Sequence, residues 1–302
     1  MRLLKILVVT VLLGLVVLVG VWLGLAQYFS RSQPAVTRAE AQASLNAAIG
    51  WLQAHEAEVL SDGNQALWRM VHKSAELTHN AYLSQLYGTY FERYYGRGHV
   101  DMWEHWLRAD STAPVTLSAL SVLEPYQRFF IYASTCNAAL GQDDDVARQL
   151  SADYCAPALP RTLRGQKDAT CSTHQLMGLS MMQERGCGDA QATQAAIAAV
   201  QADIETALRY DPRARDPYMQ RVLMLYETGA GRSVRPVWLR RVIDTQLPDG
   251  GWPGQRSIKL LFGDFAKSVG LPRTALSTEE GGAEFHATAQ GLLLMSLVVA
   301  QP

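Results

Sequence analysis

The sequence predicts an all-α protein in which an amino-terminal transmembrane helix precedes one helical domain. Residues Ile6 to Ala26 form a run of 21 positions without a charged side chain. Beyond that run, apolar residues recur at helical spacing and strand-like alternation is nearly absent. Proline at first turns and glycine after last turns punctuate a series of paired helices. About a dozen helices in pairs favour a closed ring or a solenoid over a simple bundle.

The apolar run has the length of a membrane span. At about 1.5 Å per residue it matches the roughly 30 Å hydrocarbon core of a bilayer. A cleaved secretory peptide is the alternative, because Gly24-Leu25-Ala26 places small residues where a signal peptidase reads them. We favour a retained signal anchor over residues 6–26, since a usual signal core has only roughly 7–15 residues.

The charges beside the span predict its orientation. Arg2 and Lys5 precede it, while Arg31 and Arg38 follow it before the first acid, Glu40. The short head over residues 1–5 favours the cytoplasmic side. We therefore expect a linker over residues 27–36 and a periplasmic domain over 37–302 of a single-pass inner-membrane protein. A cytoplasm-facing domain would require the reverse topology.

The overall charge argues against a nucleic-acid partner. Without Arg2 and Lys5 the chain carries 25 basic and 28 acidic residues, and its longest basic run is Arg240-Arg241. A nucleic-acid-binding surface needs a basic patch or stripe. The membrane, reached through residues 6–26, is the one partner that the sequence indicates. The ligand and the oligomeric state stay open.

Four cysteines, an even number, fall in the segment expected outside the cytosol. Cys136, Cys155, Cys171 and Cys187 allow two disulfides in three pairings, and the spacing does not rank them. Buried free thiols are the alternative. The absence of a CxxC pair argues against a cysteine-only zinc site.

The helices can be placed by their caps and apolar spacing. The first opens at Thr37 with Glu40 three positions on, which is a capping box, and it ends at Ser61-Asp62-Gly63. The remaining expected helices are Asn64–Glu76, His79–Tyr95, Asp101–Ala109, Pro125–Leu140, Asp143–Leu150, Thr173–Arg185, Asp189–Tyr210, Pro217–Glu227, Pro236–Gln246 and Phe285–Ala300.

One turn motif is specific. After the helix from Pro236 the chain reads Gln246-Leu247-Pro248-Asp249-Gly250-Gly251-Trp252, a turn with glycines that permit positive φ and an indole that can pack back over the helix. This Q-x-x-D-G-G-W string resembles the repeat of the α/α-toroid proteins, the terpene-cyclase and protein-prenyltransferase superfamily. Looser resemblances occur at Ala48–Leu52 and at Phe285–Leu293. The resemblance implies a ring of outer and inner helices.

The chain departs from the chemistry of that superfamily. The cyclase acid D-x-D-D and the magnesium motif D-D-x-x-D are missing. The run Asp143-Asp144-Asp145 fits better as negative charge at a helix amino terminus, where the partial charge of the helix is positive. The prenyltransferase-like zinc site implies an Asp, a Cys and a His. His286 stands at the start of a helix, but no Asp-x-Cys accompanies the Gln246–Trp252 turn.

Three histidines open expected inner helices. His79, His174 and His286 lie 95 and 112 residues apart, and each is followed by an apolar helix with a glycine. Three such units could bring the imidazoles to one mouth of a ring, where they would suit zinc or acid–base chemistry near neutral pH. The alternative is that each histidine simply begins its helix.

The segment between Trp252 and His286 is expected to form a flap over that mouth. It contains Asp264, Glu279 and Glu280, and it ends at Glu284, our preferred general acid or partner for His286. An exposed acidic loop is the alternative.

Aromatic residues gather in one part of the chain and indicate either a sugar-stacking surface or core packing. They are Tyr82, Tyr87, Tyr90, Phe91, Tyr94, Tyr95, Trp103 and Trp106.

Together these patterns give two functional hypotheses, and the fold alone cannot choose between them. The first is an envelope enzyme acting on a glycan, lipid-linked or peptide substrate in a central cleft. Its expected catalytic residues are His174, His286 and Glu284, and its expected metal ligands, for zinc, are His79, His174 and His286. The second is a membrane-tethered binding or assembly module without catalysis.

Overall fold

The computed structural model describes residues 2–96, 101–151, 153–155, 170–211, 216–254 and 282–301. These residues form thirteen α-helices and three short 3-10 helices. Within them extended pairing is limited to one antiparallel bridge, Pro253 with Ala283. The all-α prediction is therefore confirmed.

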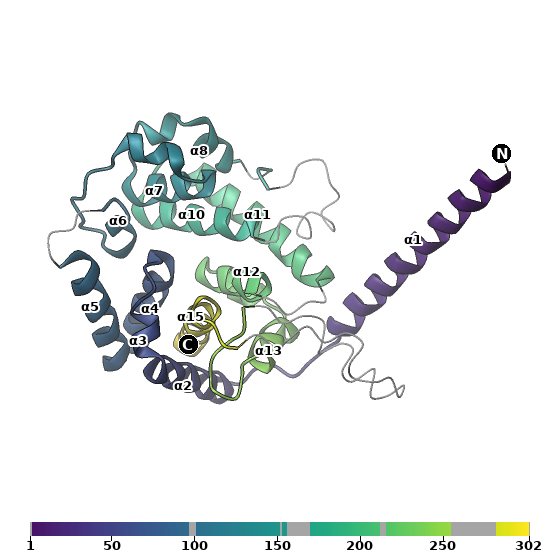
Figure 1. The fold of residues 1–302 in the computed structure, drawn as a ribbon, viewed down its shortest axis with the longest axis horizontal. Coiled ribbons are helices and arrows are strands. Elements are labelled where there is room, and N and C mark those ends of the chain that lie inside the picture. Colours follow the sequence, from purple (N-terminus) through teal and green to yellow (C-terminus); the bar gives the residue numbers. More distant parts are fainter. Residues whose placement is uncertain are drawn as a thin grey trace.

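Helix α1 (Arg2–Phe29) projects from the rest of the protein (Figure 1). Within it Leu4–Tyr28 is long and apolar enough to cross a membrane, and its apolar side chains are exposed over most of its length. An exposed helix of this composition is either a membrane anchor or a signal sequence.

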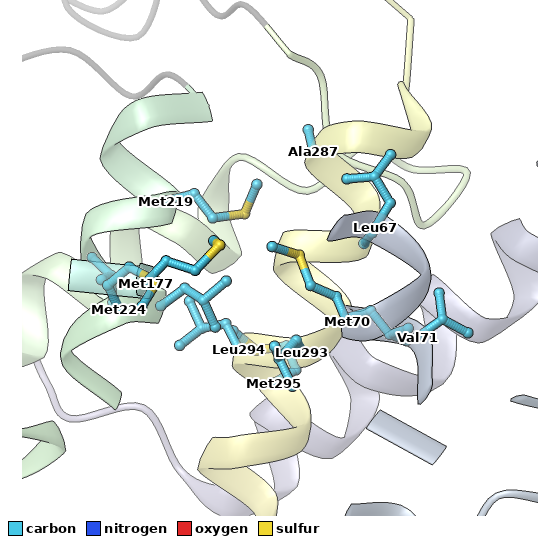
Figure 2. Close-up of a cluster of buried hydrophobic side chains, with 14 of the residues drawn as sticks. Leu67, Met70, Val71, Met177, Met219, Met224, Ala287, Leu293, Leu294 and Met295 are labelled. Atoms are coloured by element: carbon cyan, nitrogen blue, oxygen red, sulfur yellow. The ribbon is translucent and has the colours of Figure 1, made fainter. Parts of the chain in front are cut away.

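Helix α15 (Phe285–Ala300) lies at the centre of the helical domain (Figure 1). It packs against α2 (Arg38–Ala54), α4 (Gln65–Thr78) and α12 (Asp216–Glu227). Every side chain from Ala287 to Ser296 is buried, which explains why this helix is apolar on all sides. Figure 2 shows Leu293, Leu294 and Met295 of α15 among Met70 of α4 and the methionines of the neighbouring helices.

The other helices pack in pairs around this centre. Helix α10 (Cys171–Arg185) contacts α7 (Pro125–Thr135), α11 (Ala190–Tyr210) and α12, while α4 contacts α5 (Ala81–Tyr95). The shorter elements are α3 (Glu56–Val59), α6 (Glu104–Leu107), η1 (Leu117–Val122), η2 (Leu140–Gln142), α8 (Asp144–Gln149), η3 (Gly231–Ser233) and α13 (Pro236–Asp244).

Local chemistry explains where the helices begin and end. The capping box at Thr37 and Glu40 is confirmed. The first helix is shorter than predicted, because the chain breaks at His55, whose ring stacks on Trp51 and bonds its carbonyl. The helix from Pro125 also ends early, at Cys136, which takes the left-handed conformation with φ 51°.

The two disulfides join Cys136 to Cys187 and Cys155 to Cys171. The first connects the end of α7 to the turn after α10, and it closes a sequence separation of 51 residues. Such a link restricts the unfolded chain. Two disulfides are consistent with a domain outside the reducing cytosol.

The Gln246–Trp252 turn joins three helices. The Gln246 amide donates to the carbonyls of Ser44 and Gly250, so the turn is tied to α2. The indole Nε1 of Trp252 donates to Val242 of α13, and its ring packs on Gly291 of α15. The motif therefore fixes α13 and α2 against the central helix.

A cluster of charged side chains joins α4, α10 and α12. The Oε1 atom of Glu227 is 2.9 Å from Arg69 Nη1 and 2.8 Å from Lys73 Nζ. Both cations also reach Glu184 of α10. The Glu227 side chain is only 1% exposed, so its charge depends on these two cations.

Candidate functional site

A cavity of about 460 Å³ lies where the amino-terminal turns of α4, α7, α10, α12 and α15 converge. Its volume falls in the range of roughly 300–1,000 Å³ that is typical of small-molecule sites. The lining combines polar and aromatic side chains with a few apolar ones: Asn64, Gln65, Ala66, Leu67, Met70, Trp103, Trp106, Leu123, Tyr126, Gln127, Phe130, Thr170, His174, Met177, Asp216, Gln220 and His286.

His286 and Asp216 form an ion pair on one side of this cavity. The Nδ1 atom of His286 is 3.1 Å from Oδ1 of Asp216, and the imidazole is 45% exposed. The hydrogen bond to Asp216 is the main cause that raises the pKa of His286; the negative charges of Asp216, Glu284 and Asp62 add to it, while burial opposes it. A proton held at Nδ1 leaves Nε2 of the same ring for exchange with a ligand.

His174 lies on α10 with aromatic neighbours from α7. Its ring stacks on Tyr126, with centroids 4.5 Å apart and planes 14° apart, and Phe130 meets it edge-on at 5.9 Å. These contacts hold the imidazole in the cavity wall. His174 and His286 therefore line one cavity.

Trp103 and Trp106 give the same cavity large aromatic surfaces. Their rings meet edge-on at 5.7 Å, and Trp106 Nε1 donates to the Phe130 carbonyl. The upstream tyrosines have a different place: Tyr90 stacks on Trp68 at 4.0 Å and is fully buried. The aromatic segment thus divides between cavity lining and core packing.

His79 does not belong to this cavity. It follows the last residue of α4 in the left-handed conformation, with φ 51°, whereas the first residues of α4 line the cavity. The 14 residues of α4 separate the two ends by about 20 Å. Asn80, rather than His79, caps α5.

Glu284 is also not a lining residue. It is exposed, its backbone N–H donates to the Trp252 carbonyl, and its carboxylate lies against Gly254. Its negative charge raises the pKa of His286, but the carboxylate that bonds His286 is Asp216. The rest of the expected flap, with Asp264, Glu279 and Glu280, lies outside the described residues.

The described residues do not assemble the expected zinc site. Among them no group of three His, Cys, Asp or Glu side chains is placed to hold a metal ion. Zinc sites use at least three protein ligands. With His79 at the far end of α4, the proposed ligand set His79, His174 and His286 is not brought together.

Sequence reasoning missed Asp216, Tyr126 and Gln220. A signal was present, because His286 and Gln290 are polar residues four positions apart in a mostly apolar helix, and Asp216 and Gln220 repeat that spacing. Gln220 accepts a bond of 2.7 Å from Thr173, which ties α12 to α10 beside the cavity.

Comparison with protein-family models, with curated proteins and with solved structures gave no match for this chain.

The ion pair with Asp216 should be detectable in the pKa of His286. Histidine NMR titration should give His286 a pKa above the ordinary value near 6.5, and Asp216→Asn should lower it, because the hydrogen-bonding carboxylate is gone. Since the pKa is raised on folding, the pair stabilises the fold below pH about 6.5, and this contribution is lost as pH rises through the folded pKa. The other histidine signals serve as internal controls. An unchanged His286 titration in the variant would contradict the pairing.

Proposed function

We propose that this protein is a membrane-anchored, periplasmic protein whose toroid-like helical domain binds a glycan of the cell envelope in the cavity and transfers protons through His286. The observation that carries the proposal is the common lining of His286, Asp216, His174 and the tryptophans Trp103 and Trp106. The convergence of helix starts at one hollow supports the ring-like arrangement.

The lining favours a sugar over a strongly charged ligand. Indole and phenol faces pack against the apolar faces of sugar rings, while amide and carboxylate groups bond hydroxyls. Gln65, Gln127 and Gln220 supply such amides, and no Lys or Arg lines the cavity among the described residues. Among the lining residues that the structure describes, histidine is the one side chain that could pair with an anionic ligand.

The acid–base role follows from the pair itself. Asp216 fixes the imidazole through Nδ1 and favours its protonated form, so the ring can give a proton to a bound oxygen and later recover one. Asp216 thus orients and charges the ring.

One observation favours the second candidate function, a binding module without catalysis. Asp216 is the single carboxylate in the described lining, whereas glycoside hydrolysis ordinarily uses two. A domain that holds a glycan without cleaving it would need only the aromatic and amide groups.

Titration of the full-length protein in detergent with N-acetylglucosamine oligosaccharides of two to four sugars tests the proposal. We expect saturable quenching of tryptophan fluorescence. Tyr126→Ala should weaken binding about fivefold, because one aromatic contact contributes on the order of 1 kcal/mol. Val122→Ala, an exposed residue outside the lining, is the control. Binding of a tetra-alanine peptide in place of the sugars would contradict a glycan ligand.

Mass spectrometry of the incubated sugars separates the two functions. If the wild-type protein forms a modified sugar and His286→Gln does not, while the affinity of the variant for the sugar changes less than threefold, the enzyme is supported. Unchanged sugars with intact binding would support the module.

The anchor is tested separately by determining the amino-terminal sequence of the purified protein. If the anchor is retained, that sequence begins before residue 6; if it is cleaved as a signal peptide, the sequence begins after Ala26.

A further inference from the structure

We propose that four arginines at the exit of α1 dock the domain on anionic phospholipid headgroups of the bilayer that α1 spans. These residues, the arginine collar, are Arg31, Arg209 and Arg235, which lie in or contact residues 28–31, and Arg232, which lies in η3 three positions before Arg235. The inference rests on the retained anchor of the proposed function and is independent of what the cavity binds.

The length of α1 puts its end among the headgroups. Its 28 residues extend about 42 Å, whereas the hydrocarbon core is about 30 Å thick. The uncharged stretch 6–26 fills that core, so Tyr28 and the residues after it lie at headgroup depth. Trp22 and Tyr28 are aromatic residues of the kind enriched at this boundary.

The domain is fixed to this end of the anchor. Helix α1 packs on α11, and Ala26 is only 4% exposed with Trp22 and Leu25 half-buried, whereas residues 4–21 of α1 are exposed. Ser30 Oγ donates to the Arg209 carbonyl at 3.1 Å, and Arg235 Nη2 donates to the Ser30 carbonyl at 2.9 Å. Residues from three separate parts of the chain therefore meet at the carboxy-terminal end of α1. Figure 1 shows this end of α1 beside the helical domain.

The charge at this junction is positive. Arg31, Arg209 and Arg232 are exposed and Arg235 is partly exposed. Arg31 lies over the Tyr28 ring at 4.1 Å, and none of the four forms an ion pair with a carboxylate of the described residues. Of the nearby acids, Glu40 is held by Arg240 at 2.6 Å, and Glu205 stands one turn before Arg209 on α11.

Guanidinium groups suit phosphate, which they bind in a bidentate manner, and basic residues close to an anionic leaflet add to membrane attraction. Because the collar belongs to the packed domain rather than to a loose linker, lipid contact would hold the domain in one orientation on the membrane. The cavity would then open at a constant height above the headgroups.

Full-length protein in nanodiscs tests the docking. One set of discs contains phosphatidylcholine alone and the other contains 30% phosphatidylglycerol. We expect the midpoint of thermal unfolding to rise on the order of 3 °C in the anionic discs, and the rise to vanish in 0.5 M NaCl. Arg209→Gln with Arg232→Gln should abolish most of it.

The matched control is Arg93→Gln with Arg148→Gln, which removes the same charge from exposed sites on α5 and α8. This variant should keep the rise. Equal midpoints in both kinds of disc, or an equal loss in the control, would overturn the collar. Failure of the anchor looks different, because the protein would not co-elute with the neutral discs at all.

Discussion

Replacing Gly250 with alanine is expected to lower the free energy of unfolding by about 2 to 5 kcal/mol. Gly250 has φ +95°, and a Cβ added there would collide with the backbone carbonyl of Ala47 in α2. Positive φ costs a residue with a Cβ roughly 1–2 kcal/mol, and a clash with backbone in a packed interior adds roughly 1–3 kcal/mol. Because the turn ties α13 to α2 and α15, its displacement disturbs the whole centre.

Denaturant unfolding of the full-length chain in detergent, with the disulfides intact, measures this loss of stability. Alanine substitutions at two other glycines serve as controls. Gly186 also has positive φ, at +70°, but open space around it, so Gly186→Ala should cost only about 1 kcal/mol. Gly282 has open space and no positive φ, so its alanine variant should be neutral. If all three variants lost the same stability, the contact with Ala47 would be irrelevant.

Glu227→Gln is expected to cost about 3 kcal/mol at neutral pH. Burial alone would raise the pKa of Glu227, but the attraction of Arg69 and Lys73 outweighs it and lowers the pKa to about 2. The amide keeps the shape of the side chain and removes its charge, so both cations then share Glu184 alone. Loss of one partner from a buried ionic cluster leaves uncompensated charge.

The same substitution gives a pH dependence with a definite sign. The carboxylate has a lower pKa in the folded than in the unfolded state, so its contribution is complete above pH about 4.5 and is lost as pH falls toward about 2. The stability difference between wild type and Glu227→Gln should therefore shrink between pH 5 and pH 3. Glu76→Gln, on the exposed side of α4, should differ little from wild type at any pH. A constant difference across this range would contradict the low pKa.

The predictions that held depend on short-range chemistry. The capping box at Thr37 and the helix from Phe285 to Ala300 were predicted with correct starts, because caps and apolar spacing act within a few residues. His55 and Cys136 end their helices early for reasons that involve ring contacts and a disulfide. Such contacts cannot be predicted from the local pattern of residues along the sequence.

The catalytic and metal roles of the expected site residues stay predictions, and the structure shows only where their side chains lie. The sequence pattern identified three histidines near expected helix starts. Two of them, His174 and His286, line one cavity. The third, His79, follows the wrong end of its helix, and the carboxylate partner proved to be Asp216 rather than the nearer Glu284. Glu284 is close to His286 in the sequence and was therefore expected to be its partner. The packing of α12 beside α15 instead brings Asp216 into hydrogen-bonding distance of His286.

The sequence by itself determined an apolar first helix, an all-α domain, its main caps and the glycine turn before Trp252, because each follows from periodicity and backbone conformation over a few residues. Only the tertiary structure decided the two cysteine pairs, the His286–Asp216 pair, and the meeting of Ser30 with Arg209 and Arg235 at the end of α1. Each of these contacts joins residues far apart in the chain, and the way that helices pack, rather than any local pattern, sets which side chains meet.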